Sequence, residues 1–257
     1  MSLVVAPPAV WKFPAGVFGL LFPDDCRVCE APLTDVSRIP VCRKCLAAPT
    51  PLDAEYFCVV CRTPFNNAFP LDDRGQCGLC RLGLNRFDAA YSFGAYQETL
   101  RKLIHLFKYG RIRTLARPLG ALLGSTLPSD ETFDAIVPMP LHWWRRWRRG
   151  FNQSELLAQE IARRCGVAVV NAVRRKRPTA PQAGLSNTGR RENVAGAFEV
   201  RRPELIKGLR VALVDDVLTT GATANACAAA LKKAGARRVT LLVLARVDRR
   251  LAGGIAA

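Results

Sequence analysis

The pattern of apolar and polar positions near the end of the chain predicts a βαβ unit. Residues 211–214 are all apolar, which predicts a buried parallel strand, because a strand covered on both faces needs no polar alternation. An alanine-rich run over 224–233 predicts a helix, and Gly235 ends it. Residues 239–245 are again mostly apolar and predict the next strand, so this part of the chain belongs to the α/β class.

The middle of the chain carries further periodic segments. Residues 87–96 alternate enough to predict a strand, and the apolar spacing over 99–109 predicts a helix. Residues 135–140 predict the first strand of the main sheet, and 154–165 predict an amphipathic helix. Together with the βαβ unit, these segments predict a parallel sheet flanked by helices.

The turn between strand and helix in the βαβ unit predicts an anion site. Backbone N–H groups and the positive end of the helix dipole face an anion at such a turn, and threonine hydroxyls add donors. Gly221 lets the backbone approach the ligand with no Cβ in the way. The residues expected to bind the anion are Thr219, Thr220, Gly221, Ala222 and Thr223.

Two adjacent carboxylates, Asp215 and Asp216, follow the apolar run of the first strand. Open α/β sheets bind ligands at the carboxyl ends of their strands. Two acids would repel a bare phosphate unless they hold hydroxyls or a hydrated Mg²⁺, so a sugar phosphate suits both the acids and the turn. The run resembles the phosphoribosyl-pyrophosphate (PRPP) signature of type I phosphoribosyltransferases, which implies an Mg-PRPP ligand and these two acids as catalytic residues. A Rossmann-like turn with helix-capping acids is the alternative.

Eight of the ten cysteines form four Cys-x-x-Cys pairs, namely Cys26/Cys29, Cys42/Cys45, Cys58/Cys61 and Cys77/Cys80. Two-residue spacing presents paired thiolates to one metal better than it links distant segments by disulfides. We therefore expect two Cys₄ zinc sites. Sequential pairing is the simplest arrangement, and interleaved pairing of the first pair with the third stays open. Four thiolates leave no position for water, so the zinc ions are expected to be structural.

The paired cysteines end at Cys80 and periodic apolar segments begin at residue 87, which predicts a domain boundary near Arg86. Residues 1–86 would hold the two zinc ribbons, and 87–257 the phosphoribosyltransferase-like domain. The first part has nine basic and eight acidic residues, a net charge of +1, and the second has 29 and 13, a net charge of +16. A basic domain favours anionic partners such as a pyrophosphate or a polynucleotide, although a solvated basic surface explains the charge equally well.

Two arginine-rich segments supply candidate contacts for these anions. Four arginines alternate with three tryptophans over 143–149, which can contact pyrophosphate, bind single-stranded nucleic acid by stacking, or pack its tryptophans under the sheet. Arg145 and Arg149 are the candidates for pyrophosphate, together with Lys108 near the end of a predicted helix. The polar run 174–193 predicts a long loop that closes over a substrate, or one that is disordered without function.

Apolar runs are too short to predict a membrane span, since none reaches 18 residues. The apolar stretch 17–22 is better suited to a docking helix than to an anchor. The beginning of the chain has no basic segment before its apolar residues, so no signal peptide is expected. These observations favour a cytoplasmic protein.

Taken in order, the segments resemble the ComF family of competence-associated proteins over almost the whole chain. The resemblance rests on the cysteine pairs, the two acids with their Thr-rich turn, and five further motifs at 106–109, 137–141, 149–153, 179–182 and 190–194. It implies a type I phosphoribosyltransferase fold preceded by zinc ribbons, and a link to natural transformation, where incoming single-stranded DNA is handled in the cytosol. DNA-uptake or recombination proteins are then expected partners.

Two functions follow as hypotheses. In the first, the protein transfers phosphoribose from Mg-PRPP to an acceptor and releases pyrophosphate, with Asp215 and Asp216 orienting the ribose and loop arginines stabilising the leaving group. In the second, the fold senses PRPP or a related sugar phosphate without catalysis, and its basic surface holds single-stranded DNA. The acceptor of the first hypothesis has no local sequence signature.

Overall fold

The computed structural model describes residues 24–33, 37–83, 85–176, 189 and 193–248. The chain divides into two compact units, 1–47 and 48–257. Residues 48–86, which the sequence groups with the cysteine-rich segment, therefore belong to the same unit as the sheet. The functional division at residue 86 stays a prediction. The apolar stretch 17–22 lies outside the described residues.

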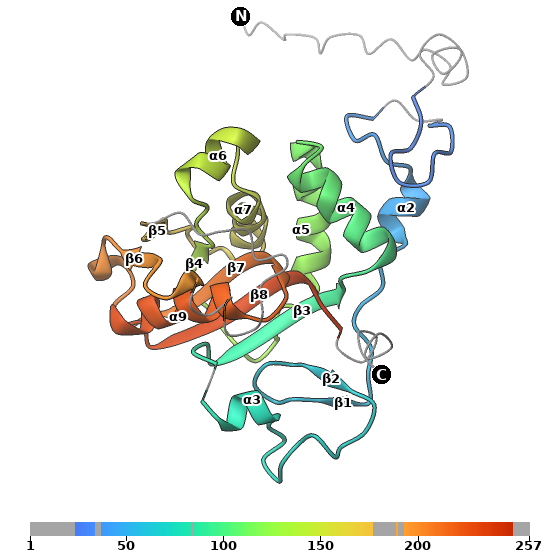
Figure 1. The fold of residues 1–257 in the computed structure, drawn as a ribbon. Helices are drawn as coiled ribbons and strands as arrows, with labels where there is room; N and C mark the ends of the chain where they lie inside the picture. The colour runs from blue at the N-terminus through green and yellow to red at the C-terminus, as the bar shows by residue number, and fades with distance from the viewer. Residues whose placement is uncertain (1–23, 34–36, 84, 177–188, 190–192, 249–257) are drawn as a thin grey trace, which may run out of the picture. The chain divides into compact units, whose positions relative to one another are not determined.

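The helices and strands follow one another along the chain as labelled in Figure 1. Their bounds are α2 Arg43–Ala47, β1 Tyr56–Phe57, β2 Pro64–Phe65, α3 Gly78–Arg81, β3 Ala89–Ala95, α4 Glu98–Lys108, η1 Arg113–Leu115, α5 Ala116–Gly124, β4 Ala135–Pro138, α6 Trp143–Arg149, α7 Gln153–Cys165, β5 Val173–Arg175, β6 Phe198–Val200, η2 Pro203–Leu205, β7 Arg210–Leu218, α9 Ala222–Lys233 and β8 Arg238–Arg246.

The main sheet has four strands in the order β3-β8-β7-β4, and all three pairings are parallel. The predicted βαβ unit is confirmed, because β7, α9 and β8 follow one another and the two strands pair directly. The strand at 135–140 is also confirmed as β4, but its expected place as the first strand was wrong. The earlier strand β3 joins the same sheet through β8, a long-range pairing that a local pattern does not reveal.

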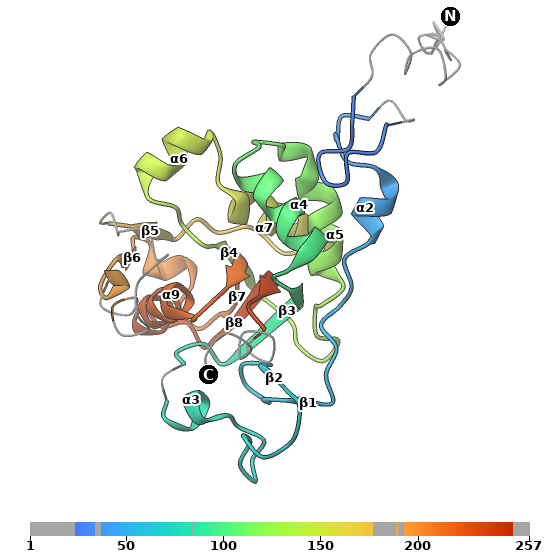
Figure 2. The ribbon, with the colours of Figure 1, turned by 45° about the vertical axis from the view of Figure 1, so that its right-hand side comes forward.

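Helices cover the sheet on both faces, which explains the apolar runs of β7 and β8. Figures 1 and 2 show α4, α5 and α7 on one face and α9 on the other. The segment that carries β1, β2 and α3 lies on the same side as α9 in both views. Its cysteines share one buried cluster with residues of α9, β7 and β8, including Leu213, Cys227 and Val243.

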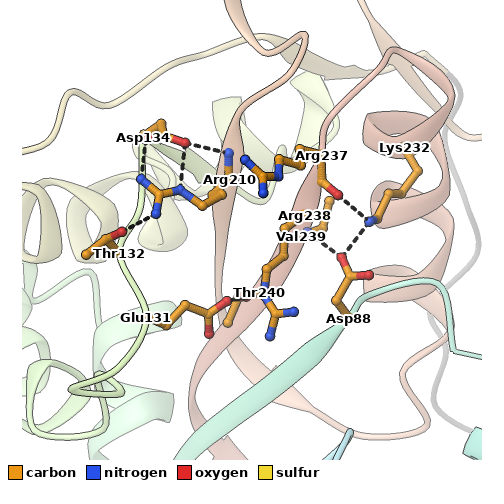
Figure 3. Close-up of polar contacts among 10 residues, drawn as sticks. All are labelled: Asp88, Glu131, Thr132, Asp134, Arg210, Lys232, Arg237, Arg238, Val239 and Thr240. Atoms are coloured by element: carbon orange, nitrogen blue, oxygen red, sulfur yellow. Dashed lines mark hydrogen bonds and ion pairs between the residues drawn. The ribbon is translucent and has the colours of Figure 1, made fainter.

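The amino ends of the four strands are tied together by polar contacts (Figure 3). Asp134, just before β4, accepts bonds from the side chain of Arg210 at 2.7 and 3.0 Å, and Arg210 begins β7. Asp88, just before β3, accepts the backbone N–H of Val239 at 2.7 Å and pairs with Lys232 at 2.6 Å. These contacts fix the amino edge of the sheet and leave the opposite, carboxyl edge to the loops.

A small antiparallel sheet replaces the start of the loop expected over 174–193. Strand β5 pairs with β6, so Arg174 and Arg175 are strand residues. The expectation of an irregular loop was therefore wrong at this end, because the strand's partner lies more than 20 residues further along the chain and the loop composition masked it. Most of the remaining run, including the proposed lid, lies outside the described residues.

We predict that Gly94→Ala destabilises the zinc-loaded protein by about 1–3 kcal/mol, since added atoms in a packed site force a shift. A Cβ at Gly94 would lie 2.8 Å from the carbonyl oxygen of Thr50 and 2.9 Å from the side chain of Leu100. Gly78→Ala is the control, because the nearest atom to its Cβ would be a flexible arginine nitrogen at 3.7 Å. Urea unfolding compares the two variants, and equal midpoints would contradict the packing described for β3.

Candidate functional site

A pocket of about 260 Å³ opens at the carboxyl edge of the sheet, where β4 and β7 end. The end of α4, the loop after β4, the end of α6, and the turn from β7 into α9 all contribute to its lining. The lining includes Asp215, Asp216, Thr219, Gly221, Ala222, Thr223, Lys108, Arg149, Tyr96, Tyr109 and Arg175. Eight of the residues that the sequence analysis names for the ligand therefore line one pocket, and their roles stay predictions.

The acid pair is held by contacts from three parts of the chain. The Ser154 hydroxyl, in the first turn of α7, donates to Asp215 Oδ1 at 3.0 Å, and the backbone N–H of Asp216 donates to the same oxygen at 2.9 Å. Lys108 Nζ, at the end of α4, lies 2.7 Å from Asp216 Oδ1. Both members of this ion pair are largely buried, so it neutralises one of the two carboxylates inside the pocket.

The two acids have different electrostatic environments. Burial, together with the adjacent charge of Asp216, raises the pKa of Asp215 to about 7, against the opposing effect of Lys108 and the Ser154 hydroxyl. Burial also opposes the charge on Lys108, but attraction to Asp216 outweighs it and the lysine pKa is raised. A cation or a donor that binds beside Asp215 would therefore favour its ionised form.

The turn after β7 has the geometry expected of an anion site. Gly221 has φ of +79° and caps the amino end of α9, a conformation that favours glycine. The side-chain oxygen of Thr220 is buried without a hydrogen-bond partner. Buried hydroxyls usually have a partner, so this one is available to a ligand or to a change in the turn. Thr220 itself does not line the pocket, whereas the other four predicted residues do.

Residues that sequence reasoning missed come mainly from α7 and β5. Asn152 caps α7 by accepting the N–H of Ser154 at 3.2 Å and donates to the carbonyl of Met139 at 3.0 Å, which places Ser154 beside Asp215. The Asn-x-Ser capping pattern signals a helix start but not what the serine faces. Arg175 lines the pocket from β5. Of the two arginines predicted for pyrophosphate, Arg149 lines the pocket, and the side chain of Arg145 lies outside the described part.

The tryptophan-rich segment forms the short helix α6, which His142 caps and the left-handed Gly150 ends. Its three tryptophans, Trp143, Trp144 and Trp147, are 70%, 49% and 79% exposed. Packing of the tryptophans under the sheet is therefore wrong. The guanidinium of Arg148 lies 5.8 Å from the Trp144 ring, and Arg146 pairs with Glu155 on α7 at 3.3 Å. An exposed aromatic surface rimmed by arginines results.

The eight paired cysteines form two separate clusters. In each cluster all four sulfur atoms lie within 4.8 Å of one another, and the pairing is sequential: Cys26, Cys29, Cys42 and Cys45 in one, Cys58, Cys61, Cys77 and Cys80 in the other. The interleaved alternative is thereby excluded. The first cluster belongs to the unit 1–47 and the second to the unit 48–257.

The sulfur geometry fits tetrahedral zinc. A Zn–S distance of about 2.3 Å places the sulfurs of a tetrahedral site about 3.8 Å apart. Cys29 and Cys42 are separated by 3.8 Å, while Cys58 and Cys80, and also Cys61 and Cys77, are separated by 3.6 Å. Burial opposes ionisation of Cys26, but backbone N–H groups outweigh it and lower its pKa to about 6, which favours the thiolate a metal needs.

Within the described residues, no helix has the length and apolar character that crossing a membrane requires.

The fold and this edge of the sheet define the class of protein. A parallel sheet between helices, with an acid pair and a glycine-capped helix at its carboxyl edge, has the type I phosphoribosyltransferase fold, and Cys₄ clusters precede it. Residues 148–252 match the family described as "Phosphoribosyl transferase domain".

Individual relatives narrow the class to a family. Competence protein F of Haemophilus influenzae is 38% identical over 169 residues, which cover 62% of this chain and 73% of that protein. DNA utilization protein YhgH of Escherichia coli K12 is 38% identical over 163 residues, covering 59% and 69%. Adenine phosphoribosyltransferase of Streptomyces coelicolor is 38% identical over 96 residues, covering 37% and 50%. The chain belongs to the ComF family.

We predict that Asp215→Asn stabilises the ligand-free protein increasingly as pH rises from 5 to 8. The unfolded chain loses the Asp215 proton near pH 3.9. The folded chain keeps it until about pH 7. Stability of the unsubstituted protein therefore falls through this window, and the asparagine removes that loss. The difference in Tm, measured in magnesium-free buffer, reports the effect.

Asp134→Asn is the matched control. Hydrogen bonds from Arg210 lower the pKa of Asp134 to about 2, whereas the pKa of Asp215 is raised. The contribution of Asp134 to stability is complete above pH 4 and disappears only as the pH falls towards 2. The control should thus be less stable than the unsubstituted protein by a constant amount between pH 5 and 8. A pH-independent effect of Asp215→Asn would contradict the environment assigned to that acid.

Proposed function

We propose that this ComF-family protein binds Mg-PRPP at the carboxyl edge of its sheet and catalyses phosphoribosyl transfer with release of pyrophosphate. The 5′-phosphate binds the turn of residues 219–223, and the ribose hydroxyls or their Mg²⁺ bind Asp215 and Asp216. The observation that supports this most strongly is the pocket in which the acid pair and the glycine-capped start of α9 meet. The names of its relatives, which refer to competence and to DNA utilization, support a role of this activity in DNA uptake. We expect DNA-uptake or recombination proteins as partners and the cytoplasm as location.

The reaction transfers the anomeric carbon of the ribose from one nucleophile to another. The bond between this carbon and the pyrophosphate oxygen breaks, pyrophosphate leaves with the electron pair, and an acceptor atom forms the new bond. Positive charge develops on the ribose as this bond breaks, so carboxylates beside the ring stabilise it. Arg149, which lines the same pocket, neutralises the leaving group, and Arg175 is placed to do the same.

Lys108 has a specific part in this proposal. Its ion pair with Asp216 at 2.7 Å balances the acid pair when the ligand is absent. Mg²⁺ or ribose at the acids would compete for the same carboxylate oxygen and release the lysine towards the pyrophosphate. Magnesium, which Asp215 and Asp216 would hold, would supply positive charge that offsets the negative charge of PRPP. The burial of Lys108 keeps its charge close to the ligand rather than in bulk water.

A second candidate function rests on the exposed face of α6. Tryptophans at 70% and 79% exposure are costly to leave in water, and bases of single-stranded nucleic acid stack on such rings. The arginines between them suit the phosphate backbone. We propose that this surface, defined by Trp143, Trp144 and Trp147, binds single-stranded DNA. Such binding is compatible both with a catalytic PRPP site and with a site that only senses PRPP. The net charge of +16 over residues 87–257 favours the same partner.

The first test is pyrophosphate release from Mg-PRPP by zinc-loaded protein, with and without single-stranded DNA. We expect release that falls at least about 100-fold when Asp215→Asn and Asp216→Asn are combined, because the charge that stabilises the transition state is gone. Asp130→Asn, an exposed acid outside the pocket, is the control and should retain activity. Undiminished release in the double variant would reject the assigned roles. PRPP binding without release would favour the sensor.

The second test is fluorescence anisotropy of a labelled oligo(dT) strand. Replacing all three tryptophans of α6 by alanine is expected to weaken binding at least tenfold, since each stacked base contributes about 1–3 kcal/mol. Affinity should also fall steeply with salt. Phe69→Ala is the control, because Phe69 is 96% exposed on the segment between the two halves of the second cysteine cluster. An affinity that is unchanged in the triple alanine variant, or that does not fall with salt, would exclude α6 as the DNA site.

A further inference from the structure

The second cysteine cluster is connected to the phosphate turn by consecutive hydrogen bonds. The side-chain nitrogen of Asn85 lies 3.0 Å from the sulfur of Cys80 and donates to it. The side-chain oxygen of Asn85 accepts from the amide nitrogen of Asn225 at 3.3 Å. Asn225 lies in the first turn of α9, two residues after Thr223, the last of the predicted phosphate-binding residues.

Asn225 also contacts the turn itself. Its backbone N–H donates to the carbonyl of Gly221 at 2.8 Å, as one of the i to i−4 bonds of the helix. The side-chain oxygen accepts the backbone N–H of Arg86 at 2.9 Å. Asn225 thus joins the start of α9, through its backbone bond to Gly221, to the chain segment that follows the last cysteine of the cluster, through its side chain.

A second route joins the same cluster to the end of β7. Arg246, the last residue of β8, is buried and donates to the carbonyl of Cys61 and to the hydroxyl of Thr63, both at 2.6 Å. Thr63 in turn lies 3.0 Å from the Cys61 sulfur. Arg246 pairs in register with Leu218, the residue before the phosphate turn. Both ends of the turn are therefore braced against the cysteine cluster.

Such contacts have a known effect on metal sites. A donor to a ligating sulfur stabilises the thiolate and fixes the direction of the ligand. Loss of the metal or oxidation of the thiolates would remove the tetrahedral arrangement that holds the Cys80 sulfur beside Asn85. Asn85 would then hold Asn225 less firmly, and the first turn of α9, which begins at the glycine of the turn, would lose this anchor. Because α9 and the cluster share a closely packed buried core, a shift of either one displaces the other.

We propose that Asn225 and Asn85 are positioning residues that couple the second Cys₄ site to the phosphate turn, so that zinc at the cluster and a phosphate at the turn stabilise one another. This inference rests on the proposed binding of Mg-PRPP. Linkage requires the effect to be reciprocal: zinc strengthens binding of the anion, and the anion slows loss of the zinc. The first cluster belongs to the other compact unit and is not part of these contacts.

The experiment uses full-length zinc-loaded protein and two readouts. Calorimetry measures the Kd of Mg-PRPP and, separately, of inorganic pyrophosphate. A chromophoric chelator with a thiol reagent measures zinc release, whose two phases are assigned with Cys29→Ser, which removes one ligand of the first cluster only. Asn85→Leu removes both polar ends of the connection at similar volume. Asn66→Leu makes the same change at an exposed position of the same segment and serves as the control.

We expect Asn85→Leu to weaken Mg-PRPP binding roughly fivefold or more. The same variant should release zinc from the second cluster about tenfold faster, while the first cluster is unchanged. Mg-PRPP should slow release from the second cluster in the unsubstituted protein and in Asn66→Leu, and clearly less in Asn85→Leu at saturating ligand, where only the route through Arg246 remains. If Asn85 only stabilised the fold, Mg-PRPP would slow zinc release from the second cluster as much in Asn85→Leu as in the unsubstituted protein. Combining Asn85→Leu with Asn225→Leu should weaken binding no more than the larger single effect, because the two residues act in one connection.

Two results would overturn the inference in distinguishable ways. If the unsubstituted protein binds Mg-PRPP and Asn85→Leu binds it equally well, the coupling is wrong and the proposed function stands. If the unsubstituted protein binds neither Mg-PRPP nor pyrophosphate, the proposed function is wrong and the coupling falls with it.

Discussion

The burial of β7 between two layers of helices is the constraint on which the rest of the structure depends. A strand covered on both faces leaves its polar residues little room except where a neighbouring strand has ended. Asp215 and Asp216 lie within β7 just past its last pair with β4, and two like charges side by side in a largely buried place require compensation. Lys108, Ser154 and the backbone of the acids themselves provide it. The compensating side chains come from α4 and α7, and Lys108 lines the pocket together with both acids.

The two edges of the sheet are specialised in opposite ways. At the amino edge, ion pairs such as those of Asp134 with Arg210 and Asp88 with Lys232 join strands and helix directly (Figure 3). At the carboxyl edge, the hydroxyl of Thr220 is buried without a partner and Asp215 has a raised pKa. Unsatisfied and perturbed groups of this kind concentrate where ligands bind.

Local patterns were sufficient to predict the turn itself and the elements α4, α7, α9, β4, β7 and β8, but not the helix α6 or the short strand β5. The apolar run of β7, the alanine-rich α9 and the two-residue cysteine spacing each depend on neighbours in sequence. Pairing across the sheet depends on residues far apart in sequence. The place of β3 in the main sheet, before β4 along the chain, was therefore not predicted. Ser154 and Asn225 were missed for the same reason: each looks like an ordinary polar residue near a helix start, and its partner lies 61 or 140 residues away. The tryptophans of α6 could not be assigned, because an aromatic segment is compatible with a core, an anion site or a surface until its exposure is known.

The most direct test of the central claim is a crystal structure of the zinc-loaded protein with Mg-PRPP. The account predicts electron density for the 5′-phosphate on the turn of residues 219–223 and for the ribose at Asp215 and Asp216. Lys108 should have left Asp216 for the pyrophosphate. Bound PRPP at another place on the protein, or in this pocket with its phosphate away from the turn and the Lys108 to Asp216 ion pair intact, would contradict it.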